Sequence, residues 1–213
     1  MDTETDFMLA DAQLRTQFAA EIPQLVHATG PVSYDYHFPK RALFDRVVEL
    51  SWHKDDSLFA GATTHVAVQN GHLLGIEIGF TGTQWNPRKA ALGPIWAQML
   101  ADGDATQEDI QEVLRNSGHA SWLNPAVPED VYYLHALSVK PEAQGKKIGM
   151  QLLSQAIRRA QDAGYRGLQL DVLSDNPAVN FYQSMGLELL VESRAPKPQQ
   201  AGVPPEFRMG IYF

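Results

Sequence analysis

The chain has 213 residues, of which 44% are hydrophobic and 20% are charged, so its length fits one or two domains and its composition is that of a folded protein. Seventeen Lys and Arg against 25 Asp and Glu give a formal net charge of −8, and such an acidic surface repels nucleic-acid phosphates and anionic lipid. Cysteine is absent from the sequence, which excludes disulfides, thiolate metal sites and a covalent cysteine intermediate.

The N-terminal third predicts helices. Residues 1–21 carry scattered acidic side chains and no apolar run, so we expect neither a signal peptide nor a membrane-spanning helix, and we expect a cytoplasmic protein. Apolar residues at positions 14, 18, 22 and 25 recur at helical spacing and predict one helix from about residue 11 to residue 28. Pro39 suits a first helical position, and a second helix is predicted from there to about Trp52.

The pattern then changes to that of strands. Alternating residues 65–69 and 73–80 flank the pair Asn70-Gly71, which is the strongest short-range signal for a β-hairpin, and we expect these two strands to start the sheet. Residues 84–130 return to helical and loop-like patterns, with a capping box that begins at Thr106 and ends at Asp109. We therefore predict one domain, residues 1–213, in which residues 84–130 form a helical insertion.

The C-terminal part predicts a βαβ unit. A β-rich run at residues 131–139, a helical stripe at 148–160 and a strand at 168–173 follow one another closely, which is typical of a parallel strand pair. A short helix ending at Gly186 and two closing strands, 187–192 and 207–213, complete the pattern. The Pro- and Gln-rich residues 195–205 are expected to form the loop between those strands.

The turn between the β-rich run and its helix has the chemistry of an anion site. It leads into a helix N-terminus, whose free N–H groups and positive dipole end favour a phosphate. Gly145 and Gly149 allow close approach of a ligand, while Lys140, Lys146 and Lys147 place cations in an otherwise acidic protein. The alternative is an ordinary strand-to-helix turn with solvated lysines.

Two motifs in this region resemble those of the GCN5-related N-acetyltransferases, the GNAT superfamily. Residues 139–153 resemble the acetyl-CoA pyrophosphate loop, with the pattern Gln/Arg-x-x-Gly-x-Gly/Ala: Gln144 and Gly149 match, whereas Lys147 occupies the middle glycine. Residues 175–187 resemble the family block Asn-x-x-Ala-x-x-x-Tyr-x-x-x-Gly-Phe, although Asn176 lies one residue closer to Tyr182 than in that pattern. The resemblance is strong over about residues 131–190.

The resemblance implies a fold and a cosubstrate. The fold is α/β (α+β): a mixed central sheet with antiparallel N-terminal strands and a parallel strand pair splayed around acetyl-CoA, flanked by helices, with residues 84–130 inserted between the third and fourth strands. Acetyl-CoA is the implied cosubstrate, with no metal. The residues that the resemblance assigns to acetyl-CoA are Leu137, Ser138, Val139, Gln144, Gly145, Lys146, Lys147, Ile148, Gly149, Asn176 and Tyr182.

Acetyl transfer to an alkylamine needs a proton acceptor, because an ammonium ion of pKa about 10.4 lies roughly 4.6 kcal/mol from its neutral form at pH 7. By resemblance, Tyr182 is the general acid that protonates the CoA thiolate, with a packing tyrosine as the alternative. His135 matches a family histidine that serves in proton removal, and the alternative is a core histidine. Glu77 is the second candidate base and Asp171 is the third. The alternative for both is an ordinary carboxylate on the face of a strand.

The predicted function is the direct transfer of an acetyl group from acetyl-CoA to a primary amine of a small molecule. A protein N-acetyltransferase and a noncatalytic acyl-CoA-binding module are the alternatives. The expected partner is a small-molecule amine, with neither nucleic acid nor membrane, and a homodimer is left open. Trp85, Trp96 and Trp122 either line an aromatic amine pocket or pack in the core. The acidic residues between 102 and 112 either attract a cationic amine or form a solvated helix face.

Overall fold

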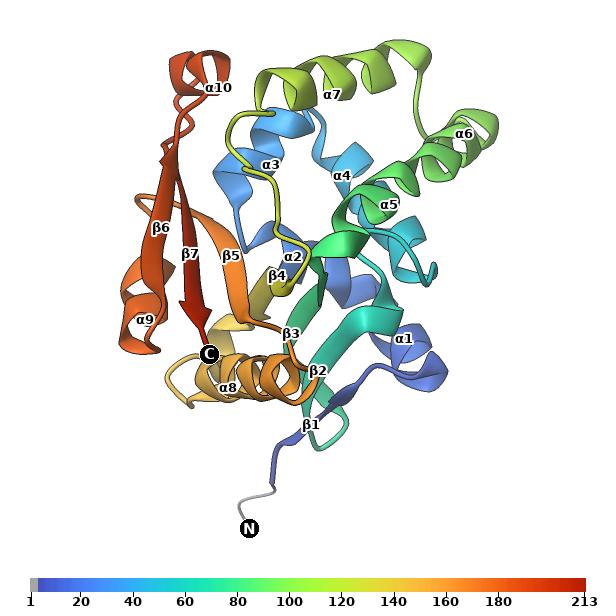
Figure 1. The fold of residues 1–213 in the computed structure, drawn as a ribbon. Helices are drawn as coiled ribbons and strands as arrows, with labels where there is room; N and C mark the ends of the chain where they lie inside the picture. The colour runs from blue at the N-terminus through green and yellow to red at the C-terminus, as the bar shows by residue number, and fades with distance from the viewer. Residues whose placement is uncertain (1–3) are drawn as a thin grey trace.

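The computed structural model describes residues 4–213, and these contain a seven-stranded mixed sheet (Figure 1). The sheet order is β1-β2-β3-β4-β5-β7-β6, and every neighbouring pair is antiparallel except β4 and β5, which are parallel. The strands are β1 (Asp6–Leu9), β2 (Thr64–Gln69), β3 (His72–Thr81), β4 (Val131–Val139), β5 (Gly167–Leu173), β6 (Glu188–Ser193) and β7 (Glu206–Tyr212). The predicted mixed α/β architecture is confirmed.

The predicted hairpin is β2 and β3. Asn70 and Gly71 have φ values of 53° and 76°, and a two-residue type I′ turn requires a positive φ at both of these positions. The expectation that this hairpin starts the sheet is wrong, because β1 pairs with β2 along the sheet edge. Four residues are too few to show a two-residue period, so β1 gives no signal of its own in the sequence.

Ten α-helices occur in the described chain. They are α1 (Ala12–Phe18), α2 (Ile22–His27), α3 (Pro31–His37), α4 (Arg41–Trp52), α5 (Trp85–Ala90), α6 (Leu92–Asp102), α7 (Gln107–His119), α8 (Ile148–Asp162), α9 (Ala178–Ser184) and α10 (Pro196–Gln200). The capping box of α7 is confirmed, since the Thr106 hydroxyl accepts from the Asp109 amide and the Asp109 carboxylate accepts from the Thr106 amide.

Three helical predictions need correction. The first helix is not continuous, because a 3₁₀ turn at Ala19–Glu21 separates α1 from α2. Helix α3 was not predicted, because a glycine followed by a proline, here Gly30-Pro31, is typical of a helix end, whereas Pro31 serves as the first residue of the next helix. Helix α10 lies within the expected loop 195–205 and likewise begins at a proline, Pro196.

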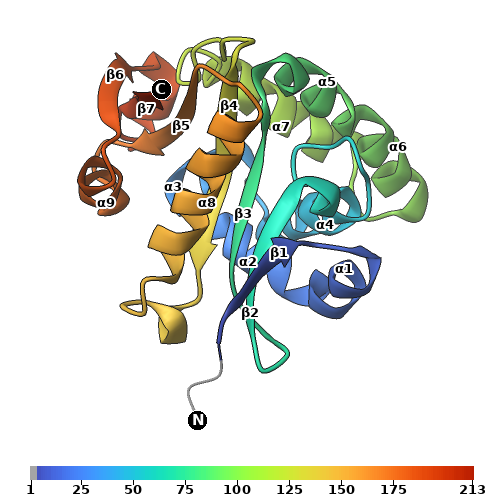
Figure 2. The ribbon, with the colours of Figure 1, turned by 60° about the horizontal axis from the view of Figure 1, so that its bottom comes forward.

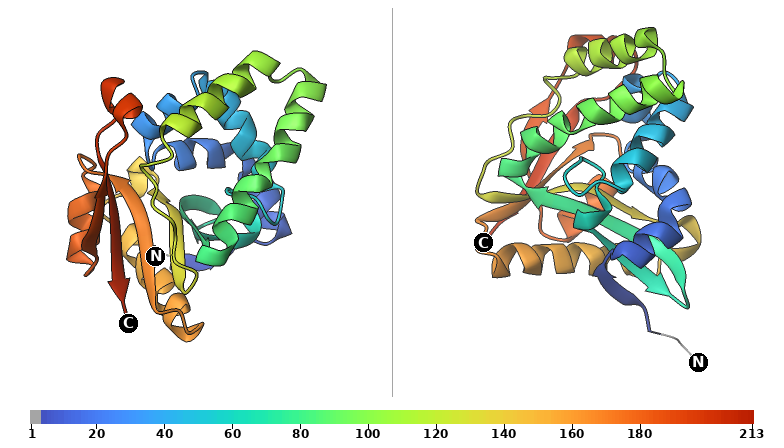
Figure 3. Two further views of the ribbon diagram at one scale, coloured as in Figure 1. Left: turned by 45° about the horizontal axis from the view of Figure 1, so that its top comes forward. Right: turned by 90° about the vertical axis from the view of Figure 1, so that its right-hand side faces the viewer.

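Helices cover both faces of the sheet (Figures 2 and 3). Helix α8 lies across β3 and β4 on one face, and its buried Leu152 and Leu153 contribute to the core there (Figure 2). On the other face, α2, α4 and the helices of the 84–130 segment form a second layer around fully buried Trp52 and Phe44 (Figure 3). The central strands are therefore covered on both faces, and a ligand can reach them where strands separate.

The strands separate between β4 and β5. They pair only from Val131 to Tyr133 on β4, opposite Gly167 to Gln169 on β5, and no pairing follows beyond these residues. In the same stretch the β3–β4 register skips His135, because Ile78 lies opposite Ala136 and Gly79 lies opposite Leu134. His135 is thus the extra residue of a β-bulge, a feature that bends a strand and redirects side chains.

Candidate active site

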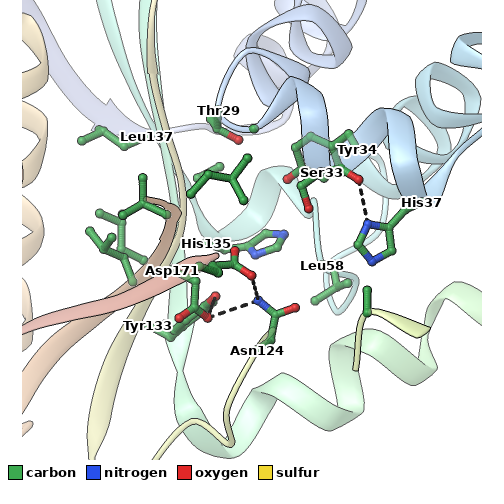
Figure 4. Close-up of a pocket in the computed structure, with 18 of the residues that line it drawn as sticks. Thr29, Ser33, Tyr34, His37, Leu58, Asn124, Tyr133, His135, Leu137 and Asp171 are labelled. Atoms are coloured by element: carbon green, nitrogen blue, oxygen red, sulfur yellow. Dashed lines mark hydrogen bonds between the residues drawn. The ribbon is translucent and has the colours of Figure 1, made fainter. Parts of the chain in front are cut away.

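A cavity of about 340 Å³ lies where β4 and β5 diverge (Figure 4). Its walls include residues 134–137 of β4 and 170–173 of β5, and Tyr182 of α9. Residues from the segment 28–38 and from the 84–130 segment close the opposite side. The cavity therefore combines the splayed strands with parts of the chain far apart in sequence.

A network of buried polar groups forms one wall of the cavity. Asp171 and Arg208 lie directly opposite each other on β5 and β7, and Arg208 Nε and Nη2 donate to the two Asp171 oxygens at 2.5 and 2.8 Å. The Tyr133 hydroxyl donates to Asp171 at 2.9 Å. Asn124 Nδ2 donates to Asp171 Oδ2 at 3.4 Å (Figure 4), and it also donates to Glu206 Oε2 at 3.2 Å. The guanidinium of Arg208 therefore neutralises Asp171. The Glu206 carboxyl, in contrast, accepts its side-chain hydrogen bond within residues 4–213 from a neutral amide, that of Asn124.

Glu206 was not predicted as a site residue. Burial raises its pKa to about 8, the negative charge of Asp171 adds to this, and Arg208 acts in the opposite direction. The Glu206 carboxyl therefore holds its proton in most molecules at neutral pH. Its sequence context, directly after Pro204-Pro205 and before an expected strand start at Phe207, carries no chemical signal. A carboxyl with a pKa near neutrality inside a cavity is a candidate for acid–base chemistry.

His135 lies in the cavity wall among aromatic rings, with ring centroids 5.3 Å from Phe59 and 5.8 Å from Trp85. Its Nε2 is buried without a hydrogen-bond partner in the described chain. Burial lowers the pKa of His135 to about 4, and the charge of Arg88 adds to this. The side chain reaches the site as expected, but its pKa is far below the value near 6.5 that a base working at neutral pH would have.

The structure does not bring Glu77 to the cavity. Its side chain is fully buried on the face covered by α8, where it accepts from the Tyr132 hydroxyl at 2.9 Å and pairs with Arg159 of α8. Adjacent Ile76 and Ile78 pack in the core of the opposite face, as the two-residue period of a strand requires. Glu77 therefore neutralises Arg159, and its expected role as a second base has no geometric support.

Tyr182 lines the cavity from α9, and its side chain is buried against Phe181 at a ring-centroid distance of 5.3 Å. No hydrogen bond from its hydroxyl to another residue of the described range is present. Burial raises the pKa of Tyr182 above its ordinary value of 10. The hydroxyl therefore keeps its proton throughout the physiological range and is free to donate it into the cavity.

The turn from β4 to α8 has a conformation that favours close approach of a ligand. Gly145 and Lys147 have φ values of 75° and 64°, so Lys147 adopts the left-handed conformation for which glycine is favoured at the family position. Lys146 and Lys147 are exposed and form no ion pair within residues 4–213, whereas Lys140 pairs with Glu21. The first turn of α8 contains no acidic residue. Two cations and a helix N-terminus thus face solvent together.

The other residues assigned to acetyl-CoA are placed as follows. Leu137 and Asn176 line the cavity, and the Asn176 side-chain oxygen accepts from the Ala178 amide at the start of α9. Ser138 and Ile148 are buried, so only their backbone groups can face a ligand. The Gln144 side chain donates to the Val139 carbonyl at 3.4 Å, which connects the turn to the end of β4.

The three tryptophans of the 84–130 segment have separate positions. Trp85 lines the cavity and contacts His135. Trp96 stacks on Phe38 in the neighbouring core, and Trp122 is 70% exposed. One of the three therefore contributes to the candidate site.

Comparison with protein families supports the assignment of this site. Residues 111–187, which include β4, the lysine-bearing turn, α8, β5 and α9, match the model of the acetyltransferase (GNAT) family. This part of the chain belongs to the GNAT family. The resemblance seen in the sequence is thereby confirmed, and GNAT domains are acetyltransferases that use acetyl-CoA. Curated protein sequences gave no significant match to the chain.

Solved structures extend the GNAT similarity in fold over nearly the whole chain. An N-acetyltransferase from Staphylococcus aureus Mu50 has 15% identity and a TM-score of 0.70, over 97% of this chain and 100% of the other. A Drosophila melanogaster polyamine N-acetyltransferase has 16% identity and a TM-score of 0.59, over 99% and 100%. The ribosomal-protein-S18-alanine N-acetyltransferase of Escherichia coli has 18% identity and a TM-score of 0.55, over 98% and 94%. At these identities the comparison shows the fold.

Within residues 4–213, no helix combines the length and the apolar character that a membrane span requires. The same residues contain no group of three or more His, Asp or Glu side chains arranged to hold a metal ion.

Gly149→Val is expected to weaken acetyl-CoA binding about tenfold, or roughly 1.4 kcal/mol. A Cβ at Gly149 meets Val139 Cγ2 at 3.5 Å and Phe181 Cζ at 3.9 Å, which are ordinary contacts, so the protein itself accommodates the first added carbon. The loss is expected because a side chain there obstructs the approach to the α8 N-terminus. Calorimetry with acetyl-CoA measures it, with Gly149→Ala as the smaller matched change. Wild-type affinity in the valine variant would show that the ligand does not approach this turn.

His135→Gln is expected to leave the pH profile of kcat/KM unchanged between about pH 5.5 and 9, with less than about a tenfold loss of rate. A histidine of pKa about 4 is neutral throughout that interval, so its replacement removes no titrating group from it. The profile is measured on folded protein with one amine and saturating acetyl-CoA. An acid limb near pH 6.5 that disappears in the variant would restore His135 as the proton acceptor.

Proposed function

We propose that the chain transfers the acetyl group of acetyl-CoA directly to the primary amine of a small molecule. The observation that carries the proposal is the cavity between the diverging ends of β4 and β5, which Tyr182 of α9 lines. The absence of cysteine favours direct transfer, since no thioester can form on the protein.

The chain offers a matching set of groups for acetyl-CoA. The exposed Lys146 and Lys147, together with the free N–H groups of α8, suit the charge of a pyrophosphate. Beyond Tyr133, the edge of β4 that faces β5 has no strand partner, so its backbone amides are available to an extended, amide-containing chain such as pantetheine. This arrangement directs the thioester towards the cavity.

Two groups are proposed to act on the reacting thioester. A backbone N–H among Leu137, Ser138 and Val139 donates to the carbonyl oxygen as negative charge develops on it. Tyr182 donates its proton to the departing thiolate, as the C–S bond breaks and the C–N bond forms. The proton that the amine nitrogen then loses restores the tyrosine through solvent, so the enzyme ends unchanged.

A small acceptor is favoured over a peptide because two other segments of the chain cover part of the cavity. Residues of the segment 28–38 and of the 84–130 segment cover it on the side away from α8, where an acceptor enters. Among the structural neighbours, the Drosophila enzyme is named for polyamines and the Escherichia coli enzyme for a protein N-terminal alanine. Both acceptor classes therefore belong in the test.

The test is a thiol-release assay with acetyl-CoA and a panel of alkylamines, arylalkylamines, amino acids, aminoglycosides and a peptide with a free N-terminal alanine. Turnover with a small amine and none with the peptide is the expected result. Turnover with the peptide alone would make the chain a protein N-acetyltransferase. Tight acetyl-CoA binding without turnover of any acceptor would support a noncatalytic binding module.

A further inference from the structure

We propose that Glu206 binds the acceptor as an ammonium ion, takes its proton, and so selects primary amines that carry one positive charge on an apolar stem. This inference rests on the proposed acetyl transfer and assigns to it an acceptor site on β7. The geometry that supports it is the position of the Glu206 carboxyl, which lines the cavity, is buried, and is hydrogen-bonded to the Asn124 amide.

The side chains around the cavity leave one carboxyl, that of Glu206, without a cationic partner. Within the described chain, the acidic side chains that line the cavity are Asp171 and Glu206. The bidentate Arg208 compensates Asp171. Both carboxyls accept from the same Asn124 nitrogen, so they lie within two hydrogen-bond lengths of each other. An ionised Glu206 is therefore complementary to one ammonium group, and a second ammonium on the same molecule finds only Asp171 in the described walls, which Arg208 already compensates.

The histidines and tyrosines of the wall carry no charge at neutral pH. Burial lowers the pKa of His37 and His135 and raises the pKa of Tyr133 and, to about 12, of Tyr34, so all four stay uncharged. Tyr182 is neutral for the same reason. Lys89 is the cation of the lining, and its side chain is exposed at the rim. A cationic rim disfavours a polycation further.

The apolar side chains that line the cavity favour an amine whose hydrocarbon chain is apolar. In the wall, Phe59 and Trp85 each contact the imidazole of His135, and Leu58 and Leu92 extend the apolar surface. Burying a methylene group of a ligand against such side chains is favourable, whereas burying an unpaired charge is not. The cavity therefore presents one polar end and one apolar end to an amine.

Glu206 is also a better proton acceptor than His135, the other candidate base that lines the cavity. In the proposed step, the ionised carboxylate takes one proton from the bound ammonium ion, which leaves a neutral amine and a protonated Glu206. After acetyl transfer the carboxyl returns that proton to solvent. With a pKa of about 8 against about 4, Glu206 accepts the proton of an ammonium ion about 10⁴-fold more favourably than His135 does.

The deciding experiment compares hexylamine and hexamethylenediamine as acceptors, since the two differ by one ammonium group on the same stem. In thiol-release assays, hexylamine is expected to give at least about tenfold higher kcat/KM than the diamine. Glu206→Gln is expected to lower kcat/KM for hexylamine at least about 100-fold, because it removes the charge and the proton acceptor but keeps the hydrogen bond with Asn124. Equal or better use of the diamine, or a glutamine variant with the wild-type rate, would overturn the inference.

A second readout does not depend on turnover. At about pH 8, hexylamine without acetyl-CoA is expected to raise the Tm of the wild type and to leave that of Glu206→Gln unchanged. Glu188→Gln is the matched control, because Glu188 is an exposed residue of neighbouring β6 that does not line the cavity, and both readouts should stay as in the wild type. Glu206→Asp keeps the charge and should retain part of both effects. A variant of Glu206 that responds to hexylamine like the wild type would contradict the assignment.

The outcomes also separate the inference from the proposed function. Failure of acetyl-CoA to bind, with the hexylamine shift intact, would reject acetyl transfer and keep the cation site. Turnover of other amines, with neither a shift nor turnover for hexylamine, would reject the cation site and keep acetyl transfer. Circular dichroism and acetyl-CoA affinity are measured on each variant first, so that unfolding is not taken for loss of the site.

Discussion

Tyr182→Phe is expected to lower kcat about 10²- to 10⁴-fold, the range for loss of a general acid, while acetyl-CoA affinity stays within about twofold of wild type. The change deletes a hydroxyl that lines the cavity and donates to no other described residue, and it keeps the ring packed on Phe181. Removal of this hydroxyl therefore leaves no buried partner unsatisfied, and the expected effect is on chemistry rather than on folding. Steady-state thiol release and calorimetry with acetyl-CoA measure the two quantities.

Tyr165→Phe serves as the control for this experiment. Tyr165 packs against Tyr132 on the α8 side of the sheet and does not line the cavity, so loss of its hydroxyl should leave kcat unchanged. A loss below about threefold in Tyr182→Phe would mean that the residue only packs, and the proton for the thiolate would then come from solvent. A loss of acetyl-CoA affinity in that variant would instead assign Tyr182 to binding.

The free energy of unfolding is expected to fall by up to about 5 kcal/mol as the pH rises from about 4.5 to about 8, because of Glu206. The folded state raises the pKa of this carboxyl from 4.5 to about 8 by burial, so between these values the native protein holds a proton that the unfolded chain releases. Stability from this source is fully present below pH 4.5 and is lost as the pH rises through 8. Urea unfolding of the wild type at several pH values measures the slope.

Glu206→Gln isolates this contribution from those of the other titrating groups. The amide cannot ionise, so the variant is expected to show a flatter pH dependence and to be more stable than the wild type near pH 8 and above. Parallel stability curves for the two proteins would show that Glu206 titrates with an ordinary pKa and that the Asn124 and Asp171 environment does not perturb it. Greater stability joined to lost turnover is the result expected of a buried charge that serves function.

The turn between β4 and α8 could be predicted from the sequence because its signals are local. The pyrophosphate-loop pattern lies within one strand-to-helix connection, and the Asn70-Gly71 hairpin lies within one turn. The structure adds that Lys147 adopts a left-handed conformation and that Lys140 is paired with Glu21, which leaves two cations at the turn. Local sequence predicted the position of this turn, and contacts across the fold determined how many of its charges are free.

Predictions about single strand residues were less secure, because a residue type does not reveal the face it occupies or its solvent access. Glu77 was a candidate base, yet the two-residue period of β3 turns it to the α8 face, where Arg159 neutralises it. His135 did reach the cavity through the bulge in β4, but its aromatic surroundings lower its pKa to about 4. In both cases the chemistry depends on neighbours supplied by other elements.

The sequence by itself determined the alternation of strands and helices in the region 131–186 and the family of that region, and it made Tyr182 a candidate site residue. Each of these is expressed in spacings of a few residues. The tertiary structure alone decided the separation of β4 from β5, the enclosure of the cavity and the placing of Glu206 beside Asp171. Residues 124, 171 and 206 are far apart in the chain, and their contact depends on the register of β5 with β7 and on the packing of the 84–130 segment. Burial and charge at such a contact are properties of the assembled fold, since solvent is excluded only once these segments pack together.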